Sequence, residues 1–391
     1  MSWPDSRVAL TRCSSYEREE VREAVRHAID LLGGIGMFVE KGSNVLLKPN
    51  LLMGAEPERC VTTHPAVVAA VAGLLKDHGC SVLIADSPGA GIVYSERNLK
   101  KVYTRTGLAD IAEEPDIRLN LDTGYRHLPN PGGKLMKGFP VIVPALDADT
   151  IVVVSKAKTH MYTYMTGAAK NIFGVVPGFE KPSFHARFTD NSSFGRMIAD
   201  LNLLVKPSLQ IMDAIRIMEG DGPMSGSPRD CGAVLASGDP FALDCVIARI
   251  MGMEPERMGW ITDAIERGIL DPAEIMTVGD DPDTFAIPDL RMPASYSRMS
   301  NNTLFNRCML KILQKYGRLY TPRPEPDLNK CNGCGNCMRT CPSGAITMPK
   351  GRPVIDMQKC IRCYCCHEMC EQNAIELKRG VAGSFLAGIF E

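Results

Sequence analysis

Two cysteine-rich runs near the end of the chain limit what it can fold into more than any other feature. "CNGCGNCMRTCP" covers residues 331–342 and "CIRCYCCHEMCE" covers residues 360–371, and both contain cysteines at gaps of two, two and three residues. Aligning Cys331 with Cys360 also superposes the Asp and Lys that precede each run and the Ala-Ile pair that follows it. The runs are therefore an internal duplication whose period, from 331 to 360, is 29 residues.

The spacing of these cysteines indicates the kind of metal centre they form. Three thiolates in the pattern C-x2-C-x2-C can bind three corners of one cubane cluster, and a fourth, three residues on, points away toward the other run. Zinc is the alternative, but a structural zinc site takes four ligands from two C-x2-C pairs. Nine of the 15 cysteines fall between residues 331 and 370. This clustering favours metal binding in a reducing compartment over a disulfide scaffold.

Residues 325–378 resemble bacterial-type ferredoxins that carry two [4Fe-4S] clusters. The resemblance implies that each cluster takes three cysteines from one run and the last cysteine from the other: Cys331, Cys334, Cys337 and Cys370 for one, and Cys360, Cys363, Cys366 and Cys341 for the other. Cys365 is expected not to be a ligand, because its use would break the two-two-three spacing. Glu371 stands where the family has a second proline, a departure that removes no ligand.

The rest of the chain has the pattern of an α/β domain. Helical patterns at 14–34, 63–79 and 239–253 alternate with short apolar runs, as in a sheet covered on both faces. We therefore predict an α/β fold with a mostly parallel sheet flanked by helices, plus a small C-terminal α+β ferredoxin-like domain. The expected strands are 8–13, 44–50, 81–86, 116–121, 150–156, 208–213, 232–237 and 275–280.

A chain of 391 residues exceeds the usual size of a single core, so more than one domain is expected. We assign the α/β domain to residues 1–290, a linker with one helix to 291–326 and the ferredoxin-like domain to 327–378. The apolar tail at 379–391 is expected to pack on the protein, because it is too short to span a bilayer.

Polar side chains follow several of the expected strands, where an open parallel sheet binds its ligands. The lysines among them predict an anion site, because they come directly after apolar runs. The alternative is that each lysine is a solvated surface charge. The expected ligand-binding residues are Lys48, Asn50, Lys156, Lys158, Lys170, Asn171 and Asp213, and those expected to move protons are His64, Asp86 and His160.

Four stretches of this domain also carry a family resemblance: "LLKPNLL", "VTTHPAVV", "SKAKTHMYTYMTGAAKNIFGVVPG" and "MEGDGP". They resemble the family catalogued as domain of unknown function 362, over about residues 40–250. Proteins of this family often precede a pair of ferredoxin-type repeats, which supports the fold and cluster predictions. The family's name leaves its chemistry open.

The charge and hydropathy of the chain limit the classes of partner that it is expected to bind. The formal net charge is −1, which gives no bulk attraction to nucleic acid. No run of 18 uncharged apolar residues is present, and the first residues lack a signal-peptide pattern. We therefore expect a cytoplasmic protein without a transmembrane segment, whose partners are an electron donor or acceptor protein and an anionic small molecule.

Two functions from different classes fit these features. The first is an iron–sulfur oxidoreductase or electron-transfer protein, in which two [4Fe-4S] clusters pass electrons to or from an anionic substrate, cofactor or partner at the α/β domain. The alternative is a non-redox ligand-binding protein or phosphometabolite enzyme whose ferredoxin domain is structural or sensory. An effect of ligand binding on the cluster potentials would separate them, because linkage is reciprocal.

Overall fold

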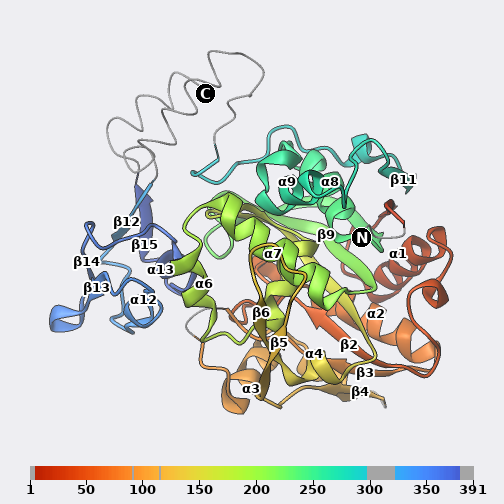
Figure 1. Cartoon of the computed structure of the whole chain (residues 1–391), viewed down its shortest axis with the longest axis horizontal. Helices are drawn as coiled ribbons and strands as arrows, with labels where there is room; N and C mark the ends of the chain where they lie inside the picture. The colour runs from red at the N-terminus through yellow and green to blue at the C-terminus, as the bar shows by residue number, and fades with distance from the viewer. Residues whose placement is uncertain (1–4, 90–91, 114–115, 297–321, 379–391) are drawn as a thin grey trace.

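The computed structural model of the chain describes residues 5–89, 92–113, 116–296 and 322–378 (Figure 1). The helix expected within 291–326 falls on residues 297–321, outside the described residues, and so does the apolar tail at 379–391. Among the described residues, no helix is both long and apolar enough to cross a membrane.

One large sheet forms the centre of the α/β domain, and every expected strand belongs to it. The strand order is β11-β1-β10-β9-β7-β2-β3-β4, with β8 paired to β7. Strands β4, β3, β2, β7 and β9 are parallel neighbours, whereas β10 is antiparallel to both β9 and β1. The sheet is therefore mostly parallel, as predicted. Its strands are β1 (Arg7–Arg12), β2 (Asn44–Pro49), β3 (Ser81–Ile84), β4 (Ile117–Leu119), β7 (Thr150–His160), β8 (Tyr164–Thr166), β9 (Leu209–Glu219), β10 (Ser227–Ser237) and β11 (Met276–Gly279).

Helices cover both faces of this sheet. The residues of β7 from Ile151 to His160 are all buried, and because successive side chains point to opposite faces, both faces must be covered. Helix α2 begins at Pro65, which has the fixed φ that a first helical turn needs, and buries three valines, two alanines and Leu75. The helices of this domain are α1 (Arg18–Leu31), α2 (Pro65–Asp77), α3 (Glu96–Arg105), α4 (Val143–Asp147), α5 (Ala168–Asn171), α6 (Lys181–Arg187), α7 (Asn191–Val205), α8 (Pro240–Ile250) and α9 (Gly259–Glu266).

A hairpin that the sequence analysis did not predict lies outside the main sheet. Its strands β5 (Tyr125–Pro129) and β6 (Gly138–Ile142) pair only with each other among the described strands. Four of the five residues of β5 are exposed, so the strand lacks the apolar run that marks the strands of the main sheet.

The C-terminal domain has two similar halves, as the duplication predicts. Helix α12 (Asn336–Arg339) and strand β13 (Ile346–Thr347) belong to the first half, and α13 (Cys365–Glu368) and β15 (Ile375–Lys378) to the second. Strand β13 pairs with β14 (Val354–Ile355), and β12 (Arg323–Pro326) pairs with β15. Strand β12 lies in the segment assigned above to the linker.

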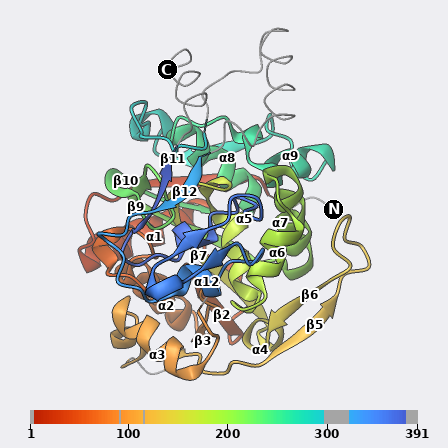
Figure 2. The ribbon, with the colours of Figure 1, turned by 90° about the vertical axis from the view of Figure 1, so that its left-hand side faces the viewer.

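The second half of the C-terminal domain lies against the α/β domain (Figures 1 and 2). Met369 packs into a small apolar cluster with side chains of the α/β domain, including Met53 and Met218. Polar contacts surround this packing. Ser225 Oγ donates to Asn373 Oδ1 at 2.9 Å, and Arg105 lies 3.7 Å from Glu371. The residue that departs from the ferredoxin pattern, Glu371, thus takes part in the contact between the domains.

Candidate functional site

The carboxyl ends of β2 and β7 bring the predicted lysines into the protein interior. The two strands are parallel neighbours, so their last residues meet at one edge of the sheet. The side chains of Lys48, Lys156 and Lys158 are at most 1% exposed. Isolated buried ammonium groups are costly, so each must be compensated by an acid, by hydrogen bonds or by a ligand. The alternative that these lysines are solvated surface charges is therefore wrong.

Lys48 is compensated by an acid. Its Nζ lies 2.8 Å from Asp86 Oδ1 and also donates to Asn171 Oδ1 at 3.3 Å. Burial lowers the pKa of Lys48, and the charge of Asp86 offsets part of that shift. A β-carbon on Gly174 would lie 1.8 Å from Asp86 Oδ1 and 2.4 Å from Lys48 Nζ. Only glycine therefore fits where the chain passes over this ion pair.

Lys158 is compensated mainly by neutral oxygens. Its Nζ donates to Asn50 Oδ1 at 2.9 Å and to the carbonyl of Val61 at 2.5 Å. The amide of Asn50 in turn donates to Asn171 Oδ1 at 3.1 Å, which links Lys158 to the Lys48 pair. Burial, followed by repulsion from Lys170 and Lys156, holds the pKa of Lys158 well below its ordinary value. A bound anion would relieve this repulsion.

Lys156, Asp213 and His64 form a second group. Lys156 Nζ lies 2.8 Å from Asp213 Oδ2, and the backbone amide of His64 donates to the same oxygen at 3.0 Å. Tyr16 Oη accepts from Lys156 at 2.8 Å and donates to Asp213 Oδ1 at 2.9 Å. His64 Nδ1 caps α2 by accepting from the amide of Ala66, and burial lowers its pKa to about 4. His64 therefore caps α2 with its side chain and contacts Asp213 with its backbone amide.

His160 points at the C-terminal domain. Its Nδ1 accepts from the backbone amide of Tyr162 at 3.0 Å, so in the neutral ring the proton is on Nε2. Nε2 lies 3.4 Å from Glu368 Oε1, an oxygen that makes no hydrogen bond with a described residue. Burial keeps the pKa of His160 well below 6.5 and raises the pKa of Glu368 to about 7, which Lys170 partly opposes. A neutral imidazole N–H group and a carboxyl group therefore meet between the domains.

Three residues near these groups were missed by the sequence analysis. Tyr16 follows β1 closely, and the rule that drew attention to strand ends could have found it. Lys181 donates to the carbonyls of Ser87 at 2.6 Å and Pro88 at 2.9 Å, and burial lowers its pKa to about 7. It follows no strand, and neither does Glu368, so no local signal marks either one.

The cysteines of the two runs approach one another as the ferredoxin resemblance implies. Burial raises the pKa of Cys337, and the thiols of Cys370, Cys334 and Cys331 lie near enough to raise it further. Cys366 likewise has as neighbours the thiols of the other expected set, Cys363, Cys360 and Cys341, together with Cys337. The last cysteine of each run therefore lies with the first three of the other.

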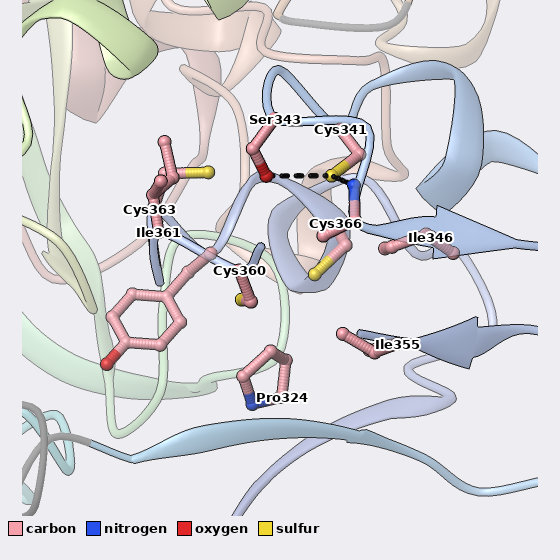
Figure 3. A pocket seen from close by; sticks show the side chains of 11 residues that line it. Pro324, Cys341, Ser343, Ile346, Ile355, Cys360, Ile361, Cys363 and Cys366 are labelled. Atoms are coloured by element: carbon pink, nitrogen blue, oxygen red, sulfur yellow. Dashed lines mark hydrogen bonds between the residues drawn. The ribbon is translucent and has the colours of Figure 1, made fainter. Parts of the chain in front are cut away.

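The surroundings of the thiols suit iron–sulfur ligation. Figure 3 shows a cavity onto which Cys341, Cys360, Cys363 and Cys366 converge, walled by apolar side chains such as Ile346 and Ile355. Backbone amides donate to the last sulfur of each run, from Ala345 at 3.2 Å and from Ala374 at 3.1 Å. Amide donors stabilise thiolates and bound sulfur. Among the described residues, no three His, Cys, Asp or Glu side chains are grouped as ligands of a lone metal ion.

Cys365 lies beside Cys363 of the second set. It is fully buried, and its thiol hydrogen-bonds with that of Cys363, which together with burial holds its pKa well above the ordinary value. The side chain also lies near Lys170 and thus near the polar strand ends. That Cys365 is not a ligand stays a prediction from the cysteine spacing.

Comparison with known proteins assigns both parts of the chain to known families. Residues 45–249 match the family described as "Domain of unknown function (DUF362)", and residues 323–371 match the "4Fe-4S dicluster domain". The chain is 33% identical over 328 residues to a thylakoid-associated protein of Synechocystis sp., an alignment that covers 80% of this chain and 98% of that protein.

One solved structure shows a weaker likeness. The lactate racemase apoprotein from Thermoanaerobacterium thermosaccharolyticum has 13% sequence identity and a TM-score of 0.38, over 59% of this chain and 54% of the racemase. The match thus spans little more than half the length of the racemase. The family match and the Synechocystis relative carry the assignment: the chain belongs to the DUF362 family and ends in a ferredoxin-type 4Fe-4S domain.

Proposed function

We propose that this protein is an iron–sulfur oxidoreductase that passes electrons between a redox partner and an anionic substrate or cofactor bound at the strand ends of the α/β domain. The observation that carries the proposal is the contact of His160 with Glu368. Glu368 ends α13, the helix that contains Cys366, and His160 ends β7, the strand that contains Lys158. The cysteine-rich domain and the polar strand ends thus adjoin each other.

The C-terminal domain would hold two [4Fe-4S] clusters, which supply one-electron transfer when bound. The first would be held by Cys331, Cys334, Cys337 and Cys370, and the second by Cys360, Cys363, Cys366 and Cys341. Cys337 and Cys366 belong to one packed group of side chains, which supports a proposal of two ligand sets side by side. The second set is the one nearer the α/β domain, since Cys363 and Cys366 are buried and α13 contacts His160.

The charges near the strand ends support an anionic ligand. Among the described residues, the carboxylates that act most strongly on Lys48, Lys158, Lys170 and Lys181 are those of Asp86 and Glu368, two acids for four lysines. Lys170 makes no hydrogen bond with a described residue, and burial lowers its pKa to about 8. An anion bound among these lysines would favour their charged forms and offset the cost of burying them.

Unused hydrogen-bonding atoms add to this argument. Ser87 Oγ, Asn171 Nδ2 and His185 Nδ1 are buried and have no hydrogen-bond partner among the described residues. Buried polar atoms are normally paired, so such a group marks a place where a ligand or water completes the bonding. In this proposal the lysines and Asn171 bind the anion, Glu368 gives or takes the proton that accompanies reduction, and the Nε2–H group of His160 stabilises the ionised form of Glu368.

We place the protein in a reducing compartment, the cytoplasm, with a redox protein as its partner. Thiolate ligands and buried free cysteines such as Cys13 and Cys245 suit such a compartment. The Synechocystis relative is described as thylakoid-associated, which supports a peripheral association of this protein with a membrane.

The test begins with anaerobic purification, assay of iron and acid-labile sulfide, and an EPR-monitored reductive titration. We expect about eight irons per chain and two interacting reduced clusters. The titration is then repeated with inorganic phosphate as the anion probe. An anion beside the second cluster disfavours the added electron, so phosphate should lower a midpoint potential; a tenfold preference for the oxidised protein equals about 59 mV.

Two variants give this test its controls. Lys170→Met should abolish the effect of phosphate while keeping the iron content, whereas Lys41→Met, at an exposed lysine before β2, should leave the effect intact. Zinc in place of iron, or clusters that resist reduction at every accessible potential, would contradict the proposal and favour the non-redox alternative.

A further inference from the structure

The two halves of the C-terminal domain have similar folds but opposite surroundings. In the second half, residues 363–369 are all buried, because α13 lies against the α/β domain. In the first half, Cys334 is exposed, and so are Met338 and Arg339 of α12. The first half therefore presents to solvent the face that the second half buries. Figure 1 shows α13 nearer the α/β domain than the β13–β14 hairpin.

Because the two halves are duplicates, their surfaces can be compared residue by residue. With the period of 29 residues, Met338 corresponds to His367 and Arg339 corresponds to Glu368. His367 lies 3.3 Å from the carbonyl of Asp221, and Glu368 lies 3.4 Å from His160, so both contact the α/β domain. The corresponding face of the first half carries an exposed methionine and an exposed arginine. This face of the first half corresponds to the α13 face that contacts the α/β domain, but it carries a basic residue where α13 carries an acid.

Apolar side chains are unusually exposed around the first cysteine run. Met338 is 42% exposed, Leu328 is 48% exposed and Val354 is 53% exposed, which makes them three of the large exposed hydrophobic residues of the described chain. Exposed apolar side chains beside a polar rim are typical of protein-binding surfaces.

Basic side chains form the rim of this surface. Arg352 donates to the carbonyls of Leu328 at 2.8 Å and Cys331 at 2.7 Å. A β-carbon on Gly335 would lie 3.2 Å from Arg339 Nη1, and one on Gly333 would lie 2.9 Å from the carbonyl of Gly351, beside Lys350. The turn that contains Cys331 and Cys334 therefore lies between Arg339 on one side and the 350–352 turn on the other.

The charge of this rim is uncompensated. Within residues 323–378, five of the six carboxylates form an ion pair with a Lys or Arg, and the sixth is the buried Glu368. Arg339, Lys350 and Arg352 form no ion pair with a described residue. The free charge beside the first cysteine run is therefore positive.

We propose that this basic and apolar face, formed by Leu328, Met338, Val354, Arg339, Lys350 and Arg352, is the docking site of a small acidic electron-carrier protein. The inference rests on the proposed function and names its partner and its point of electron entry. The carrier would give up one electron to the oxidised cluster that Cys331, Cys334, Cys337 and Cys370 would hold, a set whose member Cys334 is exposed, with no bond formed or broken. Arg339 and Lys350 guide an acidic partner, and Met338 and Leu328 supply the apolar contact.

The test uses the full-length protein with its clusters and, as the probe, a strongly acidic [2Fe-2S] ferredoxin that has been reduced beforehand and separated from the reductant. Stopped-flow absorbance gives the association rate, and calorimetry of the oxidised pair gives the affinity. In Arg339→Glu/Lys350→Glu, we expect the association rate to fall at least tenfold at low salt, and the difference from the wild type to shrink at high salt.

The matched control is Arg18→Glu/Lys41→Glu, which makes the same charge change at exposed positions of the α/β domain and should behave as the wild type. Iron content and reduction by dithionite should be unchanged in both variants. Met338→Ser tests the apolar contact without a charge change and should weaken binding. If Arg339→Glu lowers iron content, Lys350→Glu alone provides the comparison, because Lys350 lies in a turn without ligands.

Three outcomes would overturn the docking site. The charge-reversed variant could react like the wild type, the control could lose as much rate as the variant, or anionic vesicles could bind the face in place of the ferredoxin. In each of these outcomes the proposed function stands if the wild type is still reduced by dithionite and still responds to phosphate. Failure of that reduction would instead remove the proposed function.

Discussion

His160 Nε2 lies 3.4 Å from Glu368 Oε1, across the contact between the α/β domain and the C-terminal domain. The two residues are 208 positions apart in the chain, from 160 to 368, and both are buried. Their contact joins the end of a strand in the large sheet to the helix that follows Cys363. A change at either residue should therefore affect both domains.

We expect Glu368→Ala to weaken the contact between the domains. The change leaves Lys170 and His160 without the acid that faces them, so the protein should lose about 1–3 kcal/mol of stability. Glu376→Ala is the control, because its ion pair with Lys330 is exposed and should contribute at most about 1 kcal/mol. Anaerobic thermal unfolding measures both, and hydrogen exchange should show faster exchange at residues 363–369 in Glu368→Ala alone. Equal thermal shifts in the two variants would contradict the prediction.

Gly174→Ala should be strongly destabilising. The added methyl group would overlap the Lys48–Asp86 ion pair, and breaking such a buried pair costs about 3–5 kcal/mol. Gly73→Ala is a matched control, because a β-carbon there meets no atom within 4 Å and the residue lies inside α2. Alanine should stabilise that helix by about 0.5–1 kcal/mol. Urea unfolding measures the change in the free energy of unfolding, which should fall for Gly174→Ala and rise for Gly73→Ala. A wild-type midpoint for Gly174→Ala would show that the ion pair can move aside.

Cys365→Ser should keep its full iron content, whereas Cys366→Ser should lose iron. Cys365 faces Lys170 and the α/β domain, while Cys366 lies among Cys341, Cys360 and Cys363. Iron and sulfide assays of the two neighbouring variants, with EPR of the reduced proteins, make the comparison. A loss of iron in Cys365→Ser alone would reverse the assignment of ligands in the second run.

Asp244 should make stability depend on pH. It accepts hydrogen bonds from the amides of Ala168 and Ala169 at the start of α5, yet burial raises its pKa to about 7. The native state therefore binds the proton more tightly than the unfolded chain. The stability contributed by protonated Asp244 is fully present below about pH 4 and is lost as the pH rises through about 7.

The measurement is the thermal midpoint of wild type and Asp244→Asn between pH 5 and pH 8.5. The wild type should lose stability relative to the variant as the pH rises to about 7, by up to about 1.4 kcal/mol per pH unit, and the difference should level off above that. Asp147→Asn, at an exposed carboxylate, should show no such trend. A difference between wild type and Asp244→Asn that stays constant with pH would contradict the expected titration.

The sequence by itself determined most strands of the main sheet and the presence of a 4Fe-4S domain, because both depend on local spacing. Apolar runs separated by helical patterns predicted every strand of the main sheet except β8, and the cysteine gaps predicted the 4Fe-4S domain. The β5–β6 hairpin escaped prediction because β5 is largely exposed and lacks an apolar run, and because β6, although mostly buried, is short and includes Pro140.

Only the tertiary structure decided which polar residues meet. The sequence grouped Lys156 and Asp213 with Lys48 and Asp86, but the fold forms two separate ion pairs from them. It also brings Glu368 from a distant part of the chain onto His160. Such contacts depend on how the sheet, helices and C-terminal domain pack, and no spacing along the chain encodes that packing. The burial that shifts the pKa values of these residues likewise arises only when the domains come together.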